Sequence, residues 1–481
     1  MAVDKLVDSI QLNADLTSVA NAIRAKGGTS ASLAFPAGFV SAIGDIPTGG
    51  GVTVSPFSVT ANGTYTAPSG EAYSPVTVNV SGGGGSVEEK AVNFRDYDGT
   101  VVYSYTASEF AALTALPANP SHTGLTAQGW NWALTDAKTY VASYGRLEIG
   151  QMYTTSSGDT EIDCVFDDAN FLSPWLAIAV NGTVTVDWGD NTSADTITGT
   201  SDTTMKYQQH TYAQTGEYMI TIHVTSGNFA FYGRNGYVSV LRAVNAATGL
   251  AKSIAYSSAI RHIRLGGGAN IGDYAFTYCI SLQSVVIPYG MTLVSAYAFK
   301  YCYSLKYMVI PSGLTNMGGR GIFSHCYALE SVSLPRGITS WNDILFTNCF
   351  GLTFVAIPNG GVTIDSGVAV EWFSSCCKLK EVILPNDISI SKTGQLFREC
   401  NAMTEITIPS SVSTINAYAF YNCYSLAAIH FKPSTPPTVS NTSAFTSLPT
   451  NCKIYVPAGT LAAYTSATNY PSSSTYTYIE E

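Results

Sequence analysis

The residues best placed to do chemistry are Glu381 and Glu405, which occupy matching positions in two consecutive sequence repeats. Glycoside hydrolysis needs two carboxyl groups roughly 5–10 Å apart, one of them with a shifted pKa. If each repeat contributes one strand, a strand spacing of about 5 Å would bring these two carboxylates within that range. No aromatic cleft is evident beside them, so the sequence argues against glycan cleavage.

A second acidic motif, Asp96-Tyr-Asp98-Gly-Thr100, follows an apolar strand and is spelled like the nucleophile motif of haloacid-dehalogenase-type phosphatases. That resemblance implies attack on phosphorus by the first aspartate and proton transfer by the second. The surrounding sequence predicts no βαβ framework, and no later lysine and acidic pair completes such a site. We therefore expect a β-turn at Gly99 and a non-enzymatic protein.

Metal ligands are not favoured by the spacing of the polar residues. Asp187, Asp190 and Asp195 lie close together in the sequence, but aspartates at a turn usually cap backbone N–H groups. The histidines are scattered without an HExxH pattern, and the ten cysteines include no CxxC pair. We expect no metal and no cofactor.

The elements that position these residues are defined by a repeat in the C-terminal half. Phenylalanines recur there every 23 to 27 residues, a cysteine follows three residues later, and a leucine or methionine three residues after that. The phenylalanines are Phe276, Phe299, Phe323, Phe346, Phe373, Phe397, Phe420 and Phe445, and the cysteines are Cys279, Cys302, Cys326, Cys349, Cys376, Cys400 and Cys423. A period of this length with one strand per unit predicts a leucine-rich solenoid. Equivalent cysteines should stack as a ladder of buried thiols and not as disulfides.

Composition and charge exclude several classes of partner. Charged residues make up 12% of the 481 residues, hydrophobic residues 46%, and the net charge is −10 without a basic cluster. Nucleic acid binding needs Lys and Arg concentrated on one face, so it is not expected. No apolar run approaches the roughly 18–20 residues that span a bilayer, and the N-terminus does not resemble a signal peptide. We expect synthesis in the cytoplasm and no membrane insertion.

The predicted fold class is mainly β and multidomain, with short N-terminal helices, small β modules, a β-sandwich and a C-terminal solenoid. The predicted boundaries are 1–48 for a helical attachment segment, 52–80 for a small β module, 81–86 for a Gly/Ser linker, 87–157 for a mixed α/β spacer module, 158–226 for the sandwich and 227–481 for the solenoid with its cap.

Two of these parts resemble known families. The repeat Ala275-Phe-Thr-Tyr-Cys-Ile-Ser-Leu-Gln-Ser-Val-Val-Ile-Pro288 resembles the BspA-like leucine-rich repeats of bacterial surface proteins. Val186-Asp-Trp-Gly-Asp190, followed by His210-Thr-Tyr212, resembles the PKD-like immunoglobulin-type domain, although Asn191 replaces a second glycine.

The N-terminal part carries a third resemblance. Leu16-Thr-Ser-Val-Ala-Asn-Ala-Ile-Arg-Ala-Lys-Gly-Gly28 and Asn62-Gly-Thr-Tyr-Thr-Ala-Pro68 are similar to segments of tail proteins of phages that infect Gram-positive gut bacteria. This resemblance implies attachment of the N-terminus to phage tail or baseplate proteins. It also implies a homotrimer of the tail-fibre kind, although no coiled-coil heptads are present.

Recognition is better supported than catalysis. In each repeat the strand residues that alternate with the core face outward, and this strip is nearly uncharged and includes Tyr307 and Phe354. The position after each cysteine is also rich in large residues, with Tyr303, Tyr327, Phe350 and Tyr424. Exposed aromatic clusters mark contact surfaces, so these six residues are the receptor-binding candidates.

These observations predict a non-enzymatic adhesin that binds a bacterial surface receptor, glycan or protein, through the solenoid. The phage-like segments favour a tail fibre or receptor-binding protein in a virion tail. The alternative is a bacterial surface or secreted leucine-rich-repeat adhesin that binds host matrix or proteins. A glycan-cleaving enzyme is the third hypothesis.

Overall fold

The computed structural model describes β1 (Gly63–Tyr65), β2 (Val76–Val78) and residues 89–481, apart from residues 202, 233–240, 246–253, 257, 266–269, 318, 339, 342–343, 360–362, 365–370, 387–388 and 391–393. The chain divides into two compact units, residues 1–88 and 89–481. In the first unit β1 pairs antiparallel with β2, within the span predicted as a small β module. The predicted segment 1–48 and the linker 81–86 lie outside the described residues.

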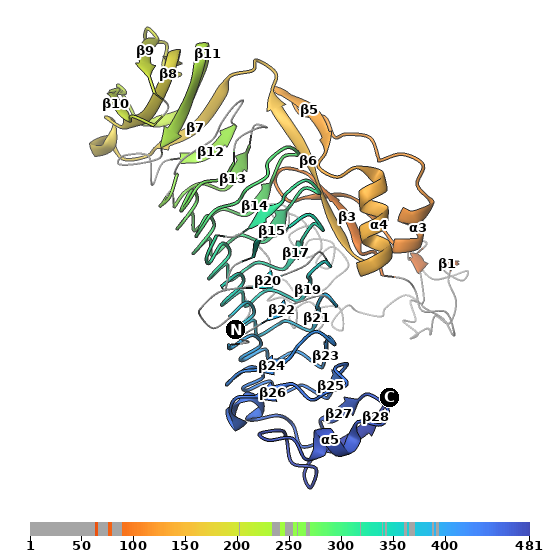
Figure 1. The fold of residues 1–481 in the computed structure, drawn as a ribbon. Helices are drawn as coiled ribbons and strands as arrows, with labels where there is room; N and C mark the ends of the chain where they lie inside the picture. Colours follow the sequence, from red (N-terminus) through yellow and green to blue (C-terminus); the bar gives the residue numbers. More distant parts are fainter. Residues whose placement is uncertain are drawn as a thin grey trace, which may run out of the picture. The chain divides into compact units, whose positions relative to one another are not determined.

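The C-terminal part winds into a parallel β-solenoid in which each repeat adds one short strand to a growing ladder (Figure 1). Six of these strands belong to one sheet: β13 (His262–Arg264), β14 (Ser284–Val286), β15 (Tyr307–Val309), β17 (Ser331–Ser333), β19 (Phe354–Ala356) and β21 (Glu381–Ile383). A second sheet continues with β23 (Glu405–Ile408), β25 (Ala428–Phe431), β27 (Lys453–Val456) and β28 (Thr477–Glu480). The predicted strand in each repeat is present, and several coils carry a second, shorter strand.

Shorter strands line another side of the coils, and a cap closes the C-terminal end. The short pairs are β16 (Asn316–Met317) with β18 (Ser340–Trp341), β20 (Thr363–Ile364) with β22 (Ser389–Ile390), and β24 (Thr414–Ile415) with β26 (Thr438–Val439). The cap contains η2 (Thr442–Phe445) and α5 (Leu461–Thr465). Among the described residues no helix is both long enough and apolar enough to span a bilayer.

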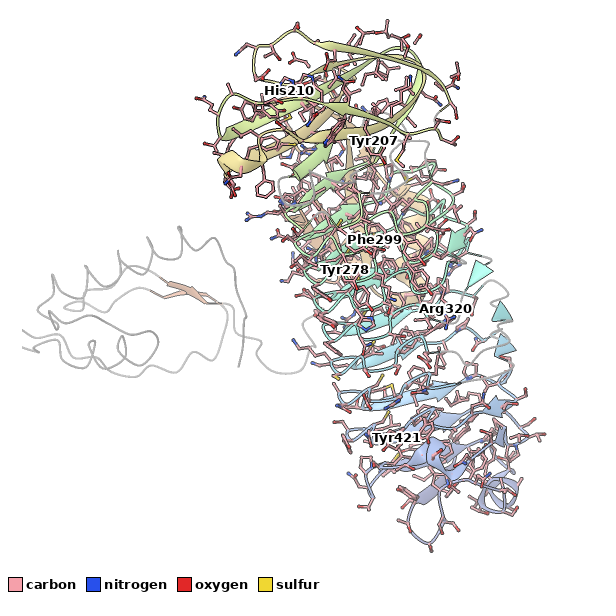
Figure 2. The ribbon with its side chains drawn as sticks, turned by 90° about the vertical axis from the view of Figure 1, so that its left-hand side faces the viewer. Tyr207, His210, Tyr278, Phe299, Arg320 and Tyr421 are labelled. Carbon is pink, nitrogen blue, oxygen red and sulfur yellow. The ribbon has the colours of Figure 1, made fainter. Side chains whose placement is uncertain are left out.

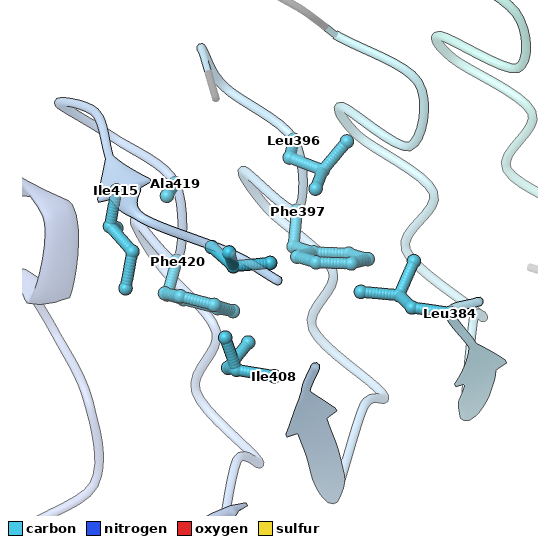
Figure 3. A pocket seen from close by; sticks show the side chains of 8 residues that line it. Leu384, Leu396, Phe397, Ile408, Ile415, Ala419 and Phe420 are labelled. Carbon is cyan, nitrogen blue, oxygen red and sulfur yellow. The ribbon is translucent and has the colours of Figure 1, made fainter. Parts of the chain in front are cut away.

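The repeated phenylalanines form the centre of the solenoid core. Neighbouring rings from Phe276 to Phe445 stack with centroids 5.0–5.9 Å apart and interplanar angles of 3–17°. A small apolar cavity of about 20 Å³ remains between Phe397 and Phe420 (Figure 3). The predicted alignment of rings along one stack is confirmed.

The repeated cysteines are all free and buried, as predicted. Each Sγ donates to a backbone carbonyl one coil earlier, which in six of the seven repeats is that of the repeated phenylalanine; Cys302, for example, reaches Phe276 O at 3.1 Å. A thiol fits this position because it is small and apolar and still carries a weak donor. Burial raises the pKa of these thiols, so they remain protonated.

The residue before each repeated cysteine adopts a left-handed backbone conformation. Its φ lies between 60° and 64° from Tyr278 to Asn422, and its N–H donates to a carbonyl of the next coil. Asn and Gly tolerate this conformation well, whereas bulky residues rarely adopt it. The first repeats nevertheless carry Tyr278, Tyr301 and His325 there.

Residues 158–232 form a strongly bent antiparallel sheet that joins the N-terminal end of the solenoid. Its strands are β7 (Thr160–Phe166), β8 (Trp175–Asp187), β9 (Asp195–Thr200), β10 (Lys206–Gln209) and β11 (Gly216–Tyr232). β8 is one long strand that pairs with β11 from Ala177 to Asp187, while its first residues pair with β10. β12 (Leu241–Asn245) then pairs with both β7 and β13, so hydrogen bonding continues from this sheet into the solenoid.

Residues 89–155 form a mixed α/β module, as the sequence predicts. Its sheet has the order β4 (Val101–Tyr105), β3 (Val92–Arg95), β6 (Leu147–Thr155) and β5 (Leu125–Trp130). The helices are α3 (Ala107–Ala112), with a capping box made by Thr106 and Glu109, and α4 (Leu134–Tyr144), which ends at Gly145. The sequence predicts a spacer, but β6 lies along the strands β13 to β17 of the solenoid (Figure 1).

Candidate recognition surfaces of the solenoid

The outward strip of strand residues, predicted to be an exposed contact surface, is largely covered by the α/β module. Phe354 is only 9% exposed and packs in the core of that module together with Ala356. Val286 and Val309 are also buried. The prediction of exposure is therefore wrong at Phe354, because the uncharged strip is the surface on which a segment of the same chain packs.

Close backbone approach and buried hydrogen bonds hold the module on this strip. A Cβ at Gly150 would lie 2.6 Å from Val286 Cγ1, so only glycine fits there without a shift. Asn131 Nδ2 donates to Ile287 O at 3.1 Å, and Trp132 Nε1 donates to Ile310 O at 2.7 Å. Buried polar groups need such partners, so these bonds fix the position of the module.

Tyr307 belongs to the same buried contact. The Arg95 guanidinium lies over its ring, 3.5 Å from the centroid, and Tyr307 Oη donates to Glu330 Oε2 at 3.0 Å. Arg95 also forms a buried ion pair with Glu148 and donates to Gly99 O at 2.8 Å. Tyr307 therefore has intramolecular partners for both its ring and its hydroxyl.

Of the candidates after the repeated cysteines, Tyr327, Phe350 and Tyr424 are exposed and Tyr303 is half-buried. Tyr303, Tyr327 and Phe350 stack on one another across three coils, with centroids 4.7 and 4.8 Å apart. Tyr327 is 37% and Phe350 39% exposed. Tyr424 occupies the same position and is 57% exposed, but among the described residues it has no ring contact. The structure therefore brings three of the six candidates together.

Two further rows of aromatic side chains lie beside this one. In the left-handed position Tyr256, Tyr278, Tyr301 and His325 follow one another with centroids 4.4–5.0 Å apart. Two residues before the repeated phenylalanine, Tyr274 stacks on Tyr297 at 5.0 Å. We call these nine residues, Tyr256, Tyr274, Tyr278, Tyr297, Tyr301, Tyr303, His325, Tyr327 and Phe350, the aromatic face; Figure 2 labels Tyr278 within it.

The three rows form one continuous surface. Lys300 Nζ lies 4.8 Å from the ring centroids of both Tyr297 and Tyr301, and so links two rows by cation–π contacts. Tyr301 contacts Tyr303 edge to face at 6.0 Å, which links the third row. Partial desolvation and neighbouring phenols raise the pKa of Tyr278 and Tyr303, so their hydroxyls remain neutral donors.

His325 completes the surface as a neutral imidazole. Burial and the nearby Lys300 lower its pKa. Asn348 Nδ2 lies 3.0 Å from Nε2, and Ser324 Oγ lies 2.8 Å from Nδ1. Because an amide nitrogen can only donate, Nε2 accepts and Nδ1 carries the proton.

The sequence-based prediction covered the outward strand positions and the position after the cysteine, and so it missed the two additional rows. Aromatic residues at the left-handed position could have been found by comparing the repeats with one another. Tyr278 and Tyr301 precede their cysteines in the first repeats, whereas Asn348 and Ser375 precede those further along.

The Asp96 to Thr100 motif forms a hydrogen-bonded turn, in which Gly99 N donates to Asp96 O at 3.0 Å. Asp96 is buried in a turn, where it accepts from Tyr97 N and pairs with His122 Nε2 at 2.7 Å, and Gly99 packs on Ser284. The predicted β-turn is present. Among the described residues no group of three or more His, Cys, Asp and Glu side chains is close enough to hold a metal ion.

The residues that resemble the PKD-like motif pack against one another. Trp188 stacks on His210 with centroids 4.6 Å apart, and His210 Nε2 lies 2.8 Å from Asp190 Oδ2. Tyr212 Oη donates to Trp188 O at 3.1 Å, and Trp188 Nε1 donates to Asp195 Oδ2 at 2.9 Å. Burial of Asp190 alone would raise its pKa, but hydrogen bonds from Thr192 and His210 lower it. His210 therefore has a packing role, and the PKD-like relationship stays a prediction.

Comparison with known proteins identifies the class of the solenoid. Residues 252–369 and 368–467 match the family model of the BspA type leucine rich repeat region, in six copies. The solenoid is therefore a BspA-type leucine-rich repeat region, as its repeats predicted. No curated protein matches the chain.

Several crystal structures of leucine-rich repeat proteins are similar to this chain. One from T. pallidum is 25% identical, with 34% of this chain and 78% of that chain covered and a TM-score of 0.29. One from Bacteroides ovatus is 19% identical, with coverage of 56% and 90% and a TM-score of 0.22. A leucine rich cell surface protein from Faecalibacterium prausnitzii is 21% identical, with coverage of 49% and 71% and a TM-score of 0.25. The assignment of the solenoid rests on the family match and not on these superpositions.

Proposed function

We propose that the protein is a non-enzymatic adhesin that binds a macromolecular receptor through the aromatic face. The observation that carries this proposal is the continuity of the face. Seven of its aromatic side chains contact one another ring to ring across neighbouring coils, and Lys300 links the remaining pair, Tyr274 and Tyr297, to them. Tyrosine provides large, rigid contact area at a small entropic cost, which is why it dominates binding surfaces.

The backbone conformation gives a second argument for function. A non-glycine residue in the left-handed region costs roughly 1–2 kcal/mol, and the cost is least for Asn, Asp and Gly. The first repeats place Tyr278, Tyr301 and His325 in this conformation, whereas the later repeats place Asn348, Ser375, Glu399 and Asn422 there. Strained residues of this kind concentrate at functional sites. An energetic cost borne by consecutive repeats is consistent with selection for the side chain.

The orientation of the rings favours a protein receptor over a glycan. Sugars bind aromatic residues mainly through the ring face, whereas the stacked rings of this surface cover one another's faces. Their edges and the phenolic hydroxyls remain available, and these suit backbone carbonyls and apolar side chains of a partner. Lys300 is the basic group within the face, so binding should depend only weakly on salt.

We favour display of the protein on a bacterial cell surface and not on a phage particle. Repeats of the BspA type occur in bacterial surface proteins, and the family match covers the aromatic face. The phage-tail hypothesis depends on segments within residues 16–101, outside that match, and it stays a prediction. Immunogold labelling of intact cells and of induced phage particles distinguishes these two locations.

The binding proposal is tested with purified protein on immobilised fibronectin, laminin and collagen, and on intact epithelial cells. We expect saturable binding to at least one of them, and at least about tenfold weaker binding for the triple variant Tyr303→Ala/Tyr327→Ala/Phe350→Ala. Tyr424→Ala is the matched control, because it removes an exposed aromatic residue at the same repeat position outside the aromatic face.

Circular dichroism should show that all variants are folded, since the altered residues lie on the surface. No saturable binding, or equal binding by the triple variant and the wild type, would refute the proposal.

A further inference from the structure

A polar pocket of about 420 Å³ opens where the α/β module ends on the solenoid. The C-terminal end of α4 forms one side, and β21 and β23 form the floor. The cover by the module ends here: Ile383 of β21 still packs against the module core, whereas Glu381 and Glu405 are exposed. Pockets of about 300–1,000 Å³ at the boundary between two packed parts are typical of ligand sites. This junction pocket lies apart from the aromatic face and does not depend on the function proposed for it.

The floor differs chemically from the covered part of the same strip. Outward positions under the module are uncharged, for example Ser333 and Ala356, whereas β21 and β23 present Glu381 and Glu405. Both carboxylates are exposed, and neither has a hydrogen-bonding or ion-pair partner among the described residues. Ile383 and Thr407 lie beside them on the same strands. The floor therefore offers free acceptors next to a small apolar area.

The wall of the pocket supplies donors. Arg336, Asn359 and Asn386 each follow a proline at the same place in three consecutive coils. Asn386 N donates to Asn359 Oδ1 at 3.0 Å, which leaves the Nδ2 group of Asn359 as a donor. The lining of the pocket therefore combines guanidinium and amide N–H groups with carboxylate oxygens.

Contacts between the module and the solenoid fix the geometry of this wall. Asn359 N donates to Tyr144 Oη at 3.3 Å, and Arg336 donates to Ser143 Oγ. The Arg336 guanidinium lies 5.7 Å from the Tyr144 ring centroid. These contacts fix the end of α4 against the turns of the coils, so the pocket is formed before any ligand binds. A preformed pocket lowers the entropic cost of binding.

We propose that the junction pocket binds an oligosaccharide of about two or three sugar rings, a size that suits its volume. Each sugar hydroxyl both donates and accepts, so a polyhydroxylated ligand needs acceptors and donors at close intervals, and Glu381, Glu405, Arg336 and the two asparagines supply them. The apolar Ile383 suits the C–H face of a ring. A basic peptide would use the carboxylates but leave the donor wall unpaired.

The proposal is tested by isothermal titration calorimetry of the full chain with trimers of N-acetylglucosamine, glucose and mannose. At least one trimer should bind with a Kd of about 1 mM or tighter. The double variant Glu381→Gln/Glu405→Gln should bind at least about tenfold more weakly, because it loses charge-assisted hydrogen bonds. Thr407→Trp, which fills the pocket from an exposed position, should abolish binding.

Glu217→Gln on β11 is the matched control, since it neutralises an exposed carboxylate away from the pocket and should bind like the wild type. Tyr303→Ala should also bind the trimer normally, so failure of this proposal and failure of the aromatic face can be told apart. Absence of binding by every trimer, or binding that none of the pocket variants weakens, would overturn the proposal. Binding of trilysine instead of the trimers would overturn the assignment of a saccharide ligand. If the wild type released reducing ends from a trimer and Glu381→Gln did not, the pocket would be a glycan-cleaving site and not a binding site.

Discussion

The buried ion pair between Arg95 and Glu148 gives the sharpest test of how the α/β module is held on the solenoid. Arg95 is 6% and Glu148 8% exposed, and Asn93 Nδ2 is the other side-chain donor to Glu148, at 3.1 Å. Replacing Arg95 with Met leaves a buried carboxylate without its cation, which costs about 3–5 kcal/mol in comparable pairs. Because Asn93 still donates, we expect the lower end, about 3 kcal/mol, or roughly a hundredfold larger population of the open state.

Hydrogen–deuterium exchange measures this opening directly at β3, β6 and the strands beneath them. The double variant Arg95→Met/Glu148→Leu serves as the control, because replacing both charges by apolar groups should restore protection to within about 1 kcal/mol of the wild type. Unchanged exchange in Arg95→Met, or a double variant as open as the single one, would show that the ion pair does not hold the module in place.

Four further predictions concern the solenoid. A thiol reagent should modify Cys377, the partly exposed cysteine, and leave the nine buried cysteines unmodified until the protein unfolds. The free energy of unfolding should also fall above pH about 9, because burial raises the pKa of the thiols in the folded state, whereas thiols of the unfolded chain ionise near that pH. The expected loss is about 1.4 kcal/mol per thiol and pH unit. A free energy of unfolding that stays constant between pH 8 and 11 in urea titrations would contradict this prediction. Tyr301→Asn should change the unfolding free energy by less than about 1 kcal/mol, since relief of left-handed strain offsets the lost stacking, yet it should weaken adhesion; a large loss of stability would show that the ring has a structural role. Val412→Ile, which fills the small cavity beside Phe397 and Phe420, should stabilise by about 0.5 kcal/mol at about 24 cal/mol per Å³, and a lower melting temperature would show that the cavity cannot accept a methyl group.

The repeat architecture could be predicted from the sequence because each repeat buries the same positions against its neighbours. Phe299 and Cys302 recur with a fixed offset, and the structure stacks both kinds of side chain along the axis. The exposed row of Tyr303, Tyr327 and Phe350 was found for the same reason, since large residues at one variable position stand out against a constant frame. Local periodicity therefore carried these predictions.

The cover over the strand strip could not be predicted from periodicity, because it comes from a segment far away in the sequence; Gly150 and Val286, which meet at this contact, are 136 residues apart. Phe354 and Glu381 occupy the same repeat position, but one is buried and the other exposed. The repeat pattern around the two residues does not predict this difference. The change from uncharged to charged residues along the strip does mark where the cover ends. Close approach at Gly150 is likewise visible only once the two surfaces meet.

The hydrogen-bonded ladder that runs from β7 through β12 into β13 and onward has a mechanical consequence. A pull along the solenoid axis loads these bonds one coil at a time, so tethered protein should lengthen in steps of roughly 80 Å, the contour length of one repeat. The α/β module bridges the first coils and would have to detach before they unwind. Under shear flow the coils would therefore unfold one after another from the C-terminal end. This stepwise unfolding would limit the force on the bound surface, so the protein would not detach in a single step.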